Sequence, residues 1–366
     1  MPMIFEHSTL GQRVMFGTGK AAEYVAAEID RLGASRPMVI AAEPERALAE
    51  RAAARITPSL WWDRVVQHVP VEVAEQARTA AEQNDADVVV SVGGGSTTGL
   101  AKAIALTTGI PVIAVPTTYA GSEATNVWGM TEDRTKTTGS DPQVLPVAVV
   151  YDAELSKTLP VGLSVASGLN GMAHCVDSLW APRTDPINQA LALEGARALS
   201  LALRGIVADA QDMEAREQAL YGCYLAAVSF AGAGSGLHHK ICHVLGGTFD
   251  LPHAQTHATV LPYVLALNAP AVPELAGRLA TALGAQGTAG DPAAAAIAAL
   301  AELYRAVNAP FRLADFGFAE EGIPEAVQRI VKAAPASNPV PVNDQNMTQL
   351  LTAALTGDRP RTGVAA

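Results

Sequence analysis

Short runs of β-branched residues alternate with helix-like stretches over about the first 155 residues of the chain. The spacing of the apolar residues predicts strands for the runs and helices for the stretches. The predicted strands are 14–16, 38–41, 88–92, 112–115 and 147–151, and the predicted helices lie near 20–32, 44–55, 72–84 and 97–108. Strands and helices in alternation build a parallel sheet with helices on both faces.

The composition changes after Leu159 and Pro160. From there to about residue 355 the chain has long periodic segments rich in alanine and leucine, with few strand signals, and this half predicts an all-helical domain. We therefore expect an α/β domain over 1–158, a helical domain over 159–356 and a frayed tail over 357–366.

Charge and apolar content limit the partners that the chain can have. Lys and Arg number 25 against 36 for Asp and Glu, a formal charge of −11, so the basic footprint of a nucleic-acid-binding protein is missing. No segment approaches the roughly 20 apolar residues of a membrane span, and the N-terminus lacks a signal-peptide pattern. Cys175, Cys223 and Cys242 have no C-x-x-C spacing, which predicts free thiols. We expect a cytoplasmic protein with neither nucleic acid nor membrane as its partner.

Two loops follow neighbouring predicted strands. Gly93, Gly94, Gly95 and Ser96 stand between the strand at 88–92 and a helix, where backbone N–H groups and the helix dipole can hold a phosphate. The alternative is a tight strand-to-helix turn without a ligand. The second loop, Pro116-Thr-Thr-Tyr-Ala-Gly-Ser-Glu123, is rich in hydroxyl groups. Because parallel sheets bind ligands at the carboxyl ends of their strands, the two loops together favour a nucleotide.

An acidic residue after the second predicted strand is a further candidate for this site. Glu43 can accept a hydrogen bond from an adenosine ribose, or it can be an exposed glutamate at a helix start.

Five of the eight histidines lie between His238 and His257. His239 and His243 are four residues apart, so they share one face of a helix. Asn170 and His174 repeat this spacing upstream, with an amide where a metal site favours a carboxylate. Such a concentration of imidazoles is typical of a lined cleft, although satisfied core histidines are the alternative.

Together, these segments resemble the iron-containing alcohol dehydrogenase superfamily over nearly the whole chain. Three of them, Pro116–Glu123, Gly236–Gly247 and Pro252–His257, are similar to the maleylacetate reductases within it. The resemblance implies a dinucleotide-binding α/β domain followed by a helical catalytic domain. In metal-dependent members the ion is held at the positions of Asn170, His174, His239 and His253. Since Asn170 is neutral, we expect no bound metal and turnover without a divalent ion.

The resemblance also implies a reaction and roles for single residues. We expect reduction of the carbon–carbon double bond of maleylacetate by NADH or NADPH, giving 3-oxoadipate in the degradation of aromatic compounds. The residues expected to contact cofactor phosphate and ribose are Gly93, Gly94, Gly95, Ser96, Thr117, Thr118 and Lys136. We expect His239, His174 and Tyr119 to stabilise charge on the substrate, His243 to donate a proton and Lys240 to bind a carboxylate. The expected partners are a small dicarboxylate and a second copy of the chain.

Three other functions stay open. A metal-dependent alcohol or polyol dehydrogenase would have to tolerate Asn170. A lyase similar to dehydroquinate synthase would meet the same difficulty. A nucleotide-binding protein without redox turnover would use its histidines only to complete a helical core.

Overall fold

The computed structural model describes residues 3–132, 135–285 and 290–360. Contacts divide the chain into an α/β unit, Leu10–Leu159, and a helical unit, which takes the chain from Pro160 onward together with the segment up to Thr9. The predicted α/β domain of 1–158 therefore differs from the α/β unit in the N-terminal segment. Residues 3–9 form no strand, and His7 among them contacts the helical unit through its side chain, which no local pattern reveals.

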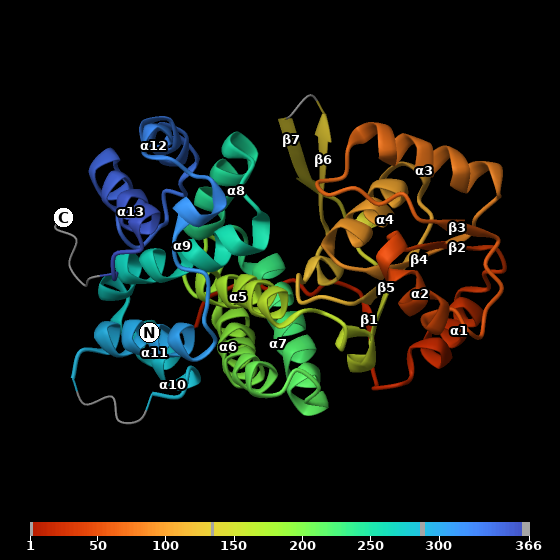
Figure 1. Ribbon diagram of the computed structural model, residues 1–366, viewed down its shortest axis with the longest axis horizontal. Helices are drawn as coiled ribbons and strands as arrows, with labels where there is room; N and C mark the ends of the chain where they lie inside the picture. Colours follow the sequence, from red (N-terminus) through yellow and green to blue (C-terminus); the bar gives the residue numbers. More distant parts are fainter. Residues whose placement is uncertain (1–2, 133–134, 286–289, 361–366) are drawn as a thin grey trace. The chain divides into compact units, whose positions relative to one another are not determined.

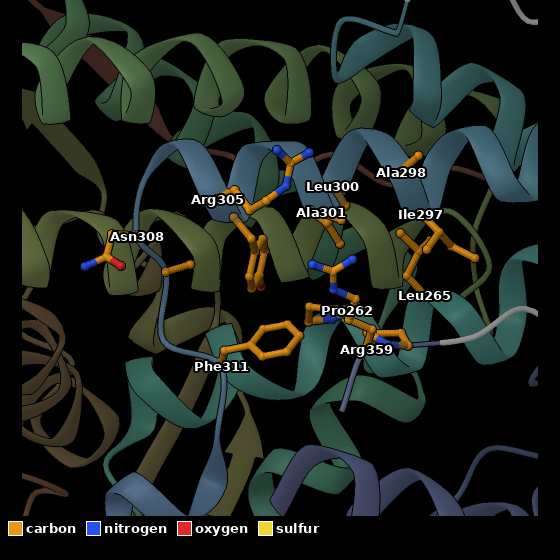
Figure 2. A pocket seen from close by; sticks show the side chains of 13 residues that line it. Pro262, Leu265, Ile297, Ala298, Leu300, Ala301, Arg305, Asn308, Phe311 and Arg359 are labelled. Atoms are coloured by element: carbon orange, nitrogen blue, oxygen red, sulfur yellow. The ribbon is translucent and has the colours of Figure 1, made fainter. Parts of the chain in front are cut away.

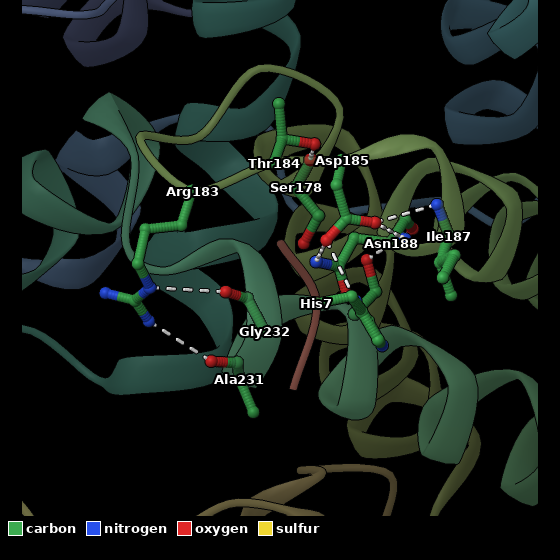
Figure 3. A network of polar contacts seen from close by, with 10 residues as sticks. His7, Ser178, Arg183, Thr184, Asp185, Ile187, Asn188, Ala231 and Gly232 are labelled. Atoms are coloured by element: carbon green, nitrogen blue, oxygen red, sulfur yellow. Dashed lines mark hydrogen bonds and ion pairs between the residues drawn. The ribbon is translucent and has the colours of Figure 1, made fainter. Parts of the chain in front are cut away.

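That contact joins His7 to Asp185 (Figure 3). His7 Nδ1 lies 2.8 Å from Asp185 Oδ2, while Asp185 Oδ1 accepts hydrogen bonds from the backbone N–H groups of Ile187 and Asn188 at 2.7 and 2.9 Å. Asp185 is thus the N-cap of the following helix, where a carboxylate also interacts favourably with the helix dipole. The same side chain ties the N-terminal segment to the helical unit.

A six-stranded parallel sheet forms the centre of the α/β unit, in the order β1-β8-β5-β4-β2-β3. Its strands are β1 (Arg13–Phe16), β2 (Pro37–Ile40), β3 (Leu60–Trp62), β4 (Val88–Gly93), β5 (Val112–Pro116) and β8 (Ala148–Tyr151), and its helices are α1 (Ala21–Leu32), α2 (Arg46–Ala52), α3 (Val71–Gln83) and α4 (Gly95–Thr108). Val88, Val90 and Val92 pack with α1 and α2, whereas Val89 packs with α3 and α4. Helices α1 and α2 lie on one side of the sheet and α3 and α4 on the other (Figure 1). Alternate residues of a strand face opposite sides of the sheet, so both faces are covered by helices, as predicted.

The ends of β4 and β5 bring the two predicted loops side by side. Gly93 lies opposite Pro116 in the parallel register, and the backbone N–H of Thr117 donates to the carbonyl of Gly93 at 3.2 Å. After the second loop comes an antiparallel hairpin of β6 (Val127–Glu132) and β7 (Thr135–Ser140). The sequence did not predict this hairpin.

The helical unit contains no strand among its described residues, as the sequence predicted. Its helices are α5 (Val161–Ser178), α6 (Pro186–Ala208), α7 (Met213–Ala233), α8 (Leu237–Phe249), α9 (His253–Asn268), α10 (Pro273–Ala282), α11 (Pro292–Ala306), α12 (Ile323–Ala333) and α13 (Asp344–Thr356). Helix α5 is buried from Ser164 to its end, so polar side chains on it must find partners inside the unit.

The three cysteines, Cys175, Cys223 and Cys242, are free and buried, as predicted. Within the described residues no single helix is both long and apolar enough to cross a membrane. Helices α7 and α8 reach that length and apolarity only as a pair bent by 98°.

Candidate active site

The glycine turn between β4 and α4 is shaped by close contacts. A Cβ on Gly93, whose φ is +155°, would lie 2.6 Å from Glu45 Oε2 and closer still to Thr97 Oγ1. Gly94 is the N-cap of α4 and has no side chain to accept hydrogen bonds from the first helical turn. The N–H groups of that turn, together with the helix dipole, fit the pyrophosphate of a nicotinamide dinucleotide.

The second loop reaches the same turn through its hydroxyl groups. Thr117 Oγ1 donates to Glu45 Oε1 at 2.5 Å, and Thr118 lies against Gly94. Burial raises the pKa of Glu45, while the hydrogen bond from Thr117 opposes that rise. The acid beside the glycine turn is therefore Glu45, and the candidate Glu43 is exposed. Both belong to one short 3-10 helix, and the sequence could not show which of the two faces inward.

Lys102 connects this turn to the second loop, and the sequence analysis did not assign it. The side chain comes from α4 and is fully buried. Its Nζ donates to the carbonyl oxygens of Ser122, Thr125 and Val127 at 2.6, 2.8 and 2.8 Å. Burial lowers the pKa of Lys102 to about 7, while the charge of Glu123 opposes the shift. These bonds hold the segment after Tyr119 against α4.

We expect Lys102→Met to lower the free energy of unfolding by about 1 to 3 kcal/mol, because buried carbonyl oxygens would lose their donor. Urea denaturation measures this change. Lys20→Met is the control, since the ammonium of Lys20 pairs with Glu23 on the surface, where an ion pair contributes about 1 kcal/mol or less. Equal midpoints for the two variants would contradict the bridging role of Lys102.

The structure says less about two other predicted residues. Tyr119 is fully buried, and its hydroxyl lies 3.5 Å from Ser156 Oγ in the same unit. Its predicted interaction with the substrate stays a prediction. Lys136 lies in β7, but its side chain is outside what the structure describes, so its predicted contact with the cofactor is untested.

Helices α5 and α8 bring together imidazoles that are far apart in the sequence. Asn170 and His174 are buried one turn apart on α5, and His239 is buried on α8. The rings of His174 and His239 stack with centroids 4.9 Å apart and an angle of 15°. Phe230 on α7 packs against both rings, at 4.7 and 4.2 Å, and was not predicted.

The start of α9 adds two more histidines. The ring of His257 lies 4.9 Å from that of His239 and 4.3 Å from that of His253. His243 and His253 are exposed, and the ring of His243 is 6.2 Å from that of His239. His174, His239, His243, His253 and His257 are named the histidine cluster below. Lys240 is half-buried beside it.

A polar pair behind the cluster was also missed by the sequence analysis. His238 Nε2 lies 3.1 Å from His257 Nδ1, and Cys242 Sγ lies 3.6 Å from His238 Nε2. The spacing of His238 and Cys242, four apart on a helix, was a signal that they share a face. It did not show that this face meets His257.

Burial keeps the inner imidazoles neutral. Burial, together with the charges of neighbouring histidines, lowers the pKa of His174 to about 4 and that of His238 to about 3. The pKa values of His239 and His257 lie well below the ordinary value for the same main reason. A neutral imidazole has one N–H and one lone pair, so each ring can donate through only one nitrogen.

Among the described residues, the ligand atoms that lie within 4.8 Å of one another belong to His238, Cys242 and His257 and not to the predicted metal positions. At the predicted positions, two imidazoles still offer nitrogens that could bind an ion. Nδ1 of His174 and Nε2 of His239 are buried without a hydrogen-bond partner among the described residues. Unprotonated imidazole nitrogens are common metal ligands. Asn170 offers a neutral amide oxygen, so it adds no negative charge to the set.

A cavity of about 570 Å³ in the helical unit is a less suitable reaction site (Figure 2). Its walls come largely from apolar side chains such as Leu265, Ile297, Leu300 and Phe311, and the cationic groups that line it are Arg305 and Arg359. It contains none of the histidines. We therefore place the chemistry at the histidine cluster.

Comparison with known proteins identifies the family. The model of the iron-containing alcohol dehydrogenases matches residues 11–153, and that of the C-terminal part of the same family matches residues 164–355. The chain belongs to the iron-containing alcohol dehydrogenase family. The prediction of family and fold is confirmed, whereas the expected absence of metal is unsupported, because the family is named for its iron.

The similar proteins include maleylacetate reductases and an iron-containing alcohol dehydrogenase. The maleylacetate reductase of Sphingobium indicum is 45% identical, over 98% of this chain and 100% of the relative, and that of Rhizobium sp. strain MTP-10005 is 44% identical over 97% and 99%. The chain is 57% identical in sequence to an iron-containing alcohol dehydrogenase from Corynebacterium glutamicum of known crystal structure, with a TM-score of 0.94 and 98% of each chain covered. That of maleylacetate reductase from Agrobacterium tumefaciens is 41% identical, with a TM-score of 0.91 over 98% and 100%.

Proposed function

We propose that this protein is an NADH- or NADPH-dependent reductase of maleylacetate that produces 3-oxoadipate in the degradation of aromatic compounds. The observation that carries the proposal is the 41–45% identity, over nearly the whole chain, to several relatives named maleylacetate reductase. The glycine turn supports the use of a dinucleotide, and the histidine cluster supplies groups for proton transfer.

The reaction sets two demands on the residues of the chain. Addition of hydride to the double bond moves charge onto the ketone oxygen as an enolate, and a proton must then reach the enolate carbon. A bound nicotinamide supplies the hydride. The exposed ring of His243 is the candidate proton donor, and the ammonium of Lys240 is the candidate contact for a substrate carboxylate. His174, His239, His253 and Asn170 form the wall around the reacting oxygen in this proposal.

A metal at the predicted positions would be held by His174, His239 and His253, with Asn170 as a neutral fourth group. Such an ion polarises a carbonyl oxygen as a Lewis acid. The chain itself contributes the lone pairs of neutral imidazoles, which burial keeps unprotonated.

We expect Asn170→Asp to raise the affinity for Zn²⁺ by about tenfold or more, which corresponds to about 1.4 kcal/mol or more, because a carboxylate offsets the charge of the ion. Competition with a coloured chelator measures the dissociation constant. Asn343→Asp adds the same charge at an exposed N-cap of the same unit and should leave the affinity unchanged. Equal affinities for both variants would show that residue 170 does not contact the ion.

The direct test of the function is oxidation of NADH and of NADPH by maleylacetate, followed by absorbance. We expect turnover of maleylacetate and poor turnover of simple alcohols with NAD. Parallel reactions with and without a chelator separate a metal-dependent from a metal-independent enzyme. Faster oxidation of a primary alcohol than reduction of maleylacetate would favour a metal-dependent alcohol dehydrogenase instead.

We also propose that the protein is a cytoplasmic homodimer. The dimer rests on the family resemblance alone. Light scattering coupled to size-exclusion chromatography tests the dimer, and a monomer mass would contradict it.

A further inference from the structure

Asp177, near the end of α5, is a buried carboxylate that meets the start of α8. Its Oδ2 accepts a hydrogen bond from the backbone N–H of Gly236 at 2.9 Å, and its Oδ1 lies 3.4 Å from the N–H of His238. The same Oδ2 is 2.8 Å from His239 Nδ1. The side chains of Asp177 and His239 are 0% and 3% exposed, so water does not compete for these contacts.

Gly236 makes this approach possible. A Cβ at this position would overlap the carboxylate of Asp177. The glycine in the sequence Gly236-Leu-His-His239 therefore leaves space for a side chain from a different helix.

The direction of the hydrogen bond to His239 follows from the other donors. Backbone N–H groups at the start of α8 already point at the carboxylate, and the helix dipole favours a negative charge there. Burial raises the pKa of Asp177 to about 7, while the hydrogen bonds from the backbone of Gly236, His238 and His239 lower it. Both carboxylate oxygens accept backbone N–H groups, Oδ2 from Gly236 and Oδ1 from His238, so the ring nitrogen 2.8 Å from Oδ2 is placed as a third donor and Nδ1 of His239 carries the proton.

The opposite nitrogen of the ring then keeps its lone pair. A second proton would place a buried N–H group without an acceptor at the other ring nitrogen, so the ring carries one proton only. Nε2 is buried and has no hydrogen-bond partner among the described residues. It lies on a ring that stacks with His174 and approaches His257 to 4.9 Å.

We propose that Asp177 is a positioning residue that holds His239 in the Nδ1–H tautomer and presents its Nε2 to the active site as a lone-pair donor. The role of this nitrogen in catalysis rests on the proposed function. The proposal changes one expectation from the sequence. A neutral His239 in this tautomer cannot donate a hydrogen bond to an enolate oxygen, whereas it can accept a proton or bind a cation.

The chain offers a matched control in Asp185 and His7. Their carboxylate–imidazole contact is also 2.8 Å, and Asp185 also accepts backbone N–H groups at a helix start (Figure 3). His7 is not a member of the histidine cluster. Removal of either carboxylate should destabilise a helix start, but only removal of Asp177 should change the active site.

The tautomer can be read directly from long-range ¹⁵N–¹H spectra of the full chain labelled with ¹⁵N-histidine, recorded with chelator and without substrate. A His239→Gln variant assigns the signal. We expect the Nδ1–H tautomer for His239 in the parent protein and a shift toward Nε2–H in Asp177→Ala. Asp177→Asn should largely retain Nδ1–H, since its amide oxygen can take the place of Oδ2 and accept from both Gly236 and His239.

Metal binding and kinetics complete the test. Loss of a residue that orients a ligand typically costs about 10- to 100-fold in metal affinity or activity. We expect a loss of this size in Co²⁺ affinity and in kcat for Asp177→Ala, with little change in KM, partial rescue in Asp177→Asn and no change in Asp185→Ala. If Asp177→Ala does not fold, the parent spectrum and Asp177→Asn still decide the question.

Two results would overturn the proposal. One is an Nε2–H tautomer for His239 in the parent protein. The other is a folded Asp177→Ala variant that keeps the Nδ1–H tautomer and the parent Co²⁺ affinity. Failure of the parent protein to reduce maleylacetate would overturn the proposed function alone, because the tautomer and the Co²⁺ affinity are measured without that reaction.

Discussion

His243→Ala is expected to lower kcat for the reduction of maleylacetate by about 10² to 10⁴-fold, the usual cost of losing a general acid. The ring of His243 is exposed and lies 6.2 Å from the ring of the buried His239 on the same helix. Of these two histidines, His243 is therefore the one that can exchange protons with solvent. Single-turnover kinetics with reduced cofactor measures the chemical step. Because an exposed ring leaves an accessible space, added imidazole should restore part of the rate.

His7→Ala is the matched control for His243→Ala. It removes an imidazole of the same unit that contacts Asp185 and lies outside the histidine cluster, so kcat should stay at the parent value. An unchanged kcat in His243→Ala would show that another group supplies the proton. A reduced kcat without any rescue by imidazole would favour a role for His243 in positioning.

Most of the strands that the sequence predicted well are buried on both faces, although β1, predicted at 14–16, is largely exposed. β4, β5 and β8 consist mainly of buried β-branched and aliphatic residues, and such runs stand out against the helices around them. β3 is only three residues long, and β7 has the polar sequence Thr-Lys-Thr-Thr-Gly-Ser. Neither has a pattern strong enough to separate a strand from a loop.

From residue spacing alone, the active site was predictable only within single helices, and it was the family resemblance that grouped His174, His239 and His253. A spacing of four placed Asn170 beside His174 and His239 beside His243, because that spacing follows from the geometry of one helix. The spacing itself did not indicate that α5 and α8 pack together, so it revealed neither the stacking of His174 on His239 nor the contact from Asp177. These contacts depend on tertiary packing, which sequence spacing does not encode.

The glycine turn shows the same limit of prediction from sequence in the α/β unit. Three glycines after a strand indicated close approach to a phosphate, but they did not show which glycine is needed for folding and which for binding. The structure distinguishes the glycine needed for folding from the one available for binding. A Cβ on Gly93 would meet Glu45 and Thr97 within the unit, whereas a Cβ on Gly94 would meet only Thr118, 3.0 Å away.

Gly94→Val is therefore expected to weaken the binding of NADH and NADPH without unfolding the protein. A branched side chain at the N-cap of α4 would push against Thr118 and occupy space at the N–H groups that a phosphate needs. Overpacking of this kind typically costs about 1 to 3 kcal/mol. If that cost falls on the bound state, the dissociation constant rises by about 10- to 100-fold. Titration of nicotinamide fluorescence measures it.

Two further variants show whether this loss belongs to the binding turn. Gly11→Val adds the same side chain in the same unit at a position where a Cβ meets no atom within 4 Å, so cofactor affinity should not change. Gly93→Ala should instead lower the melting temperature, because its Cβ would overlap Glu45 and Thr97 before any ligand binds. If Gly94→Val folds normally and binds both cofactors with the parent affinity, the glycine turn is only a structural connection between β4 and α4. The dinucleotide would then have to bind elsewhere.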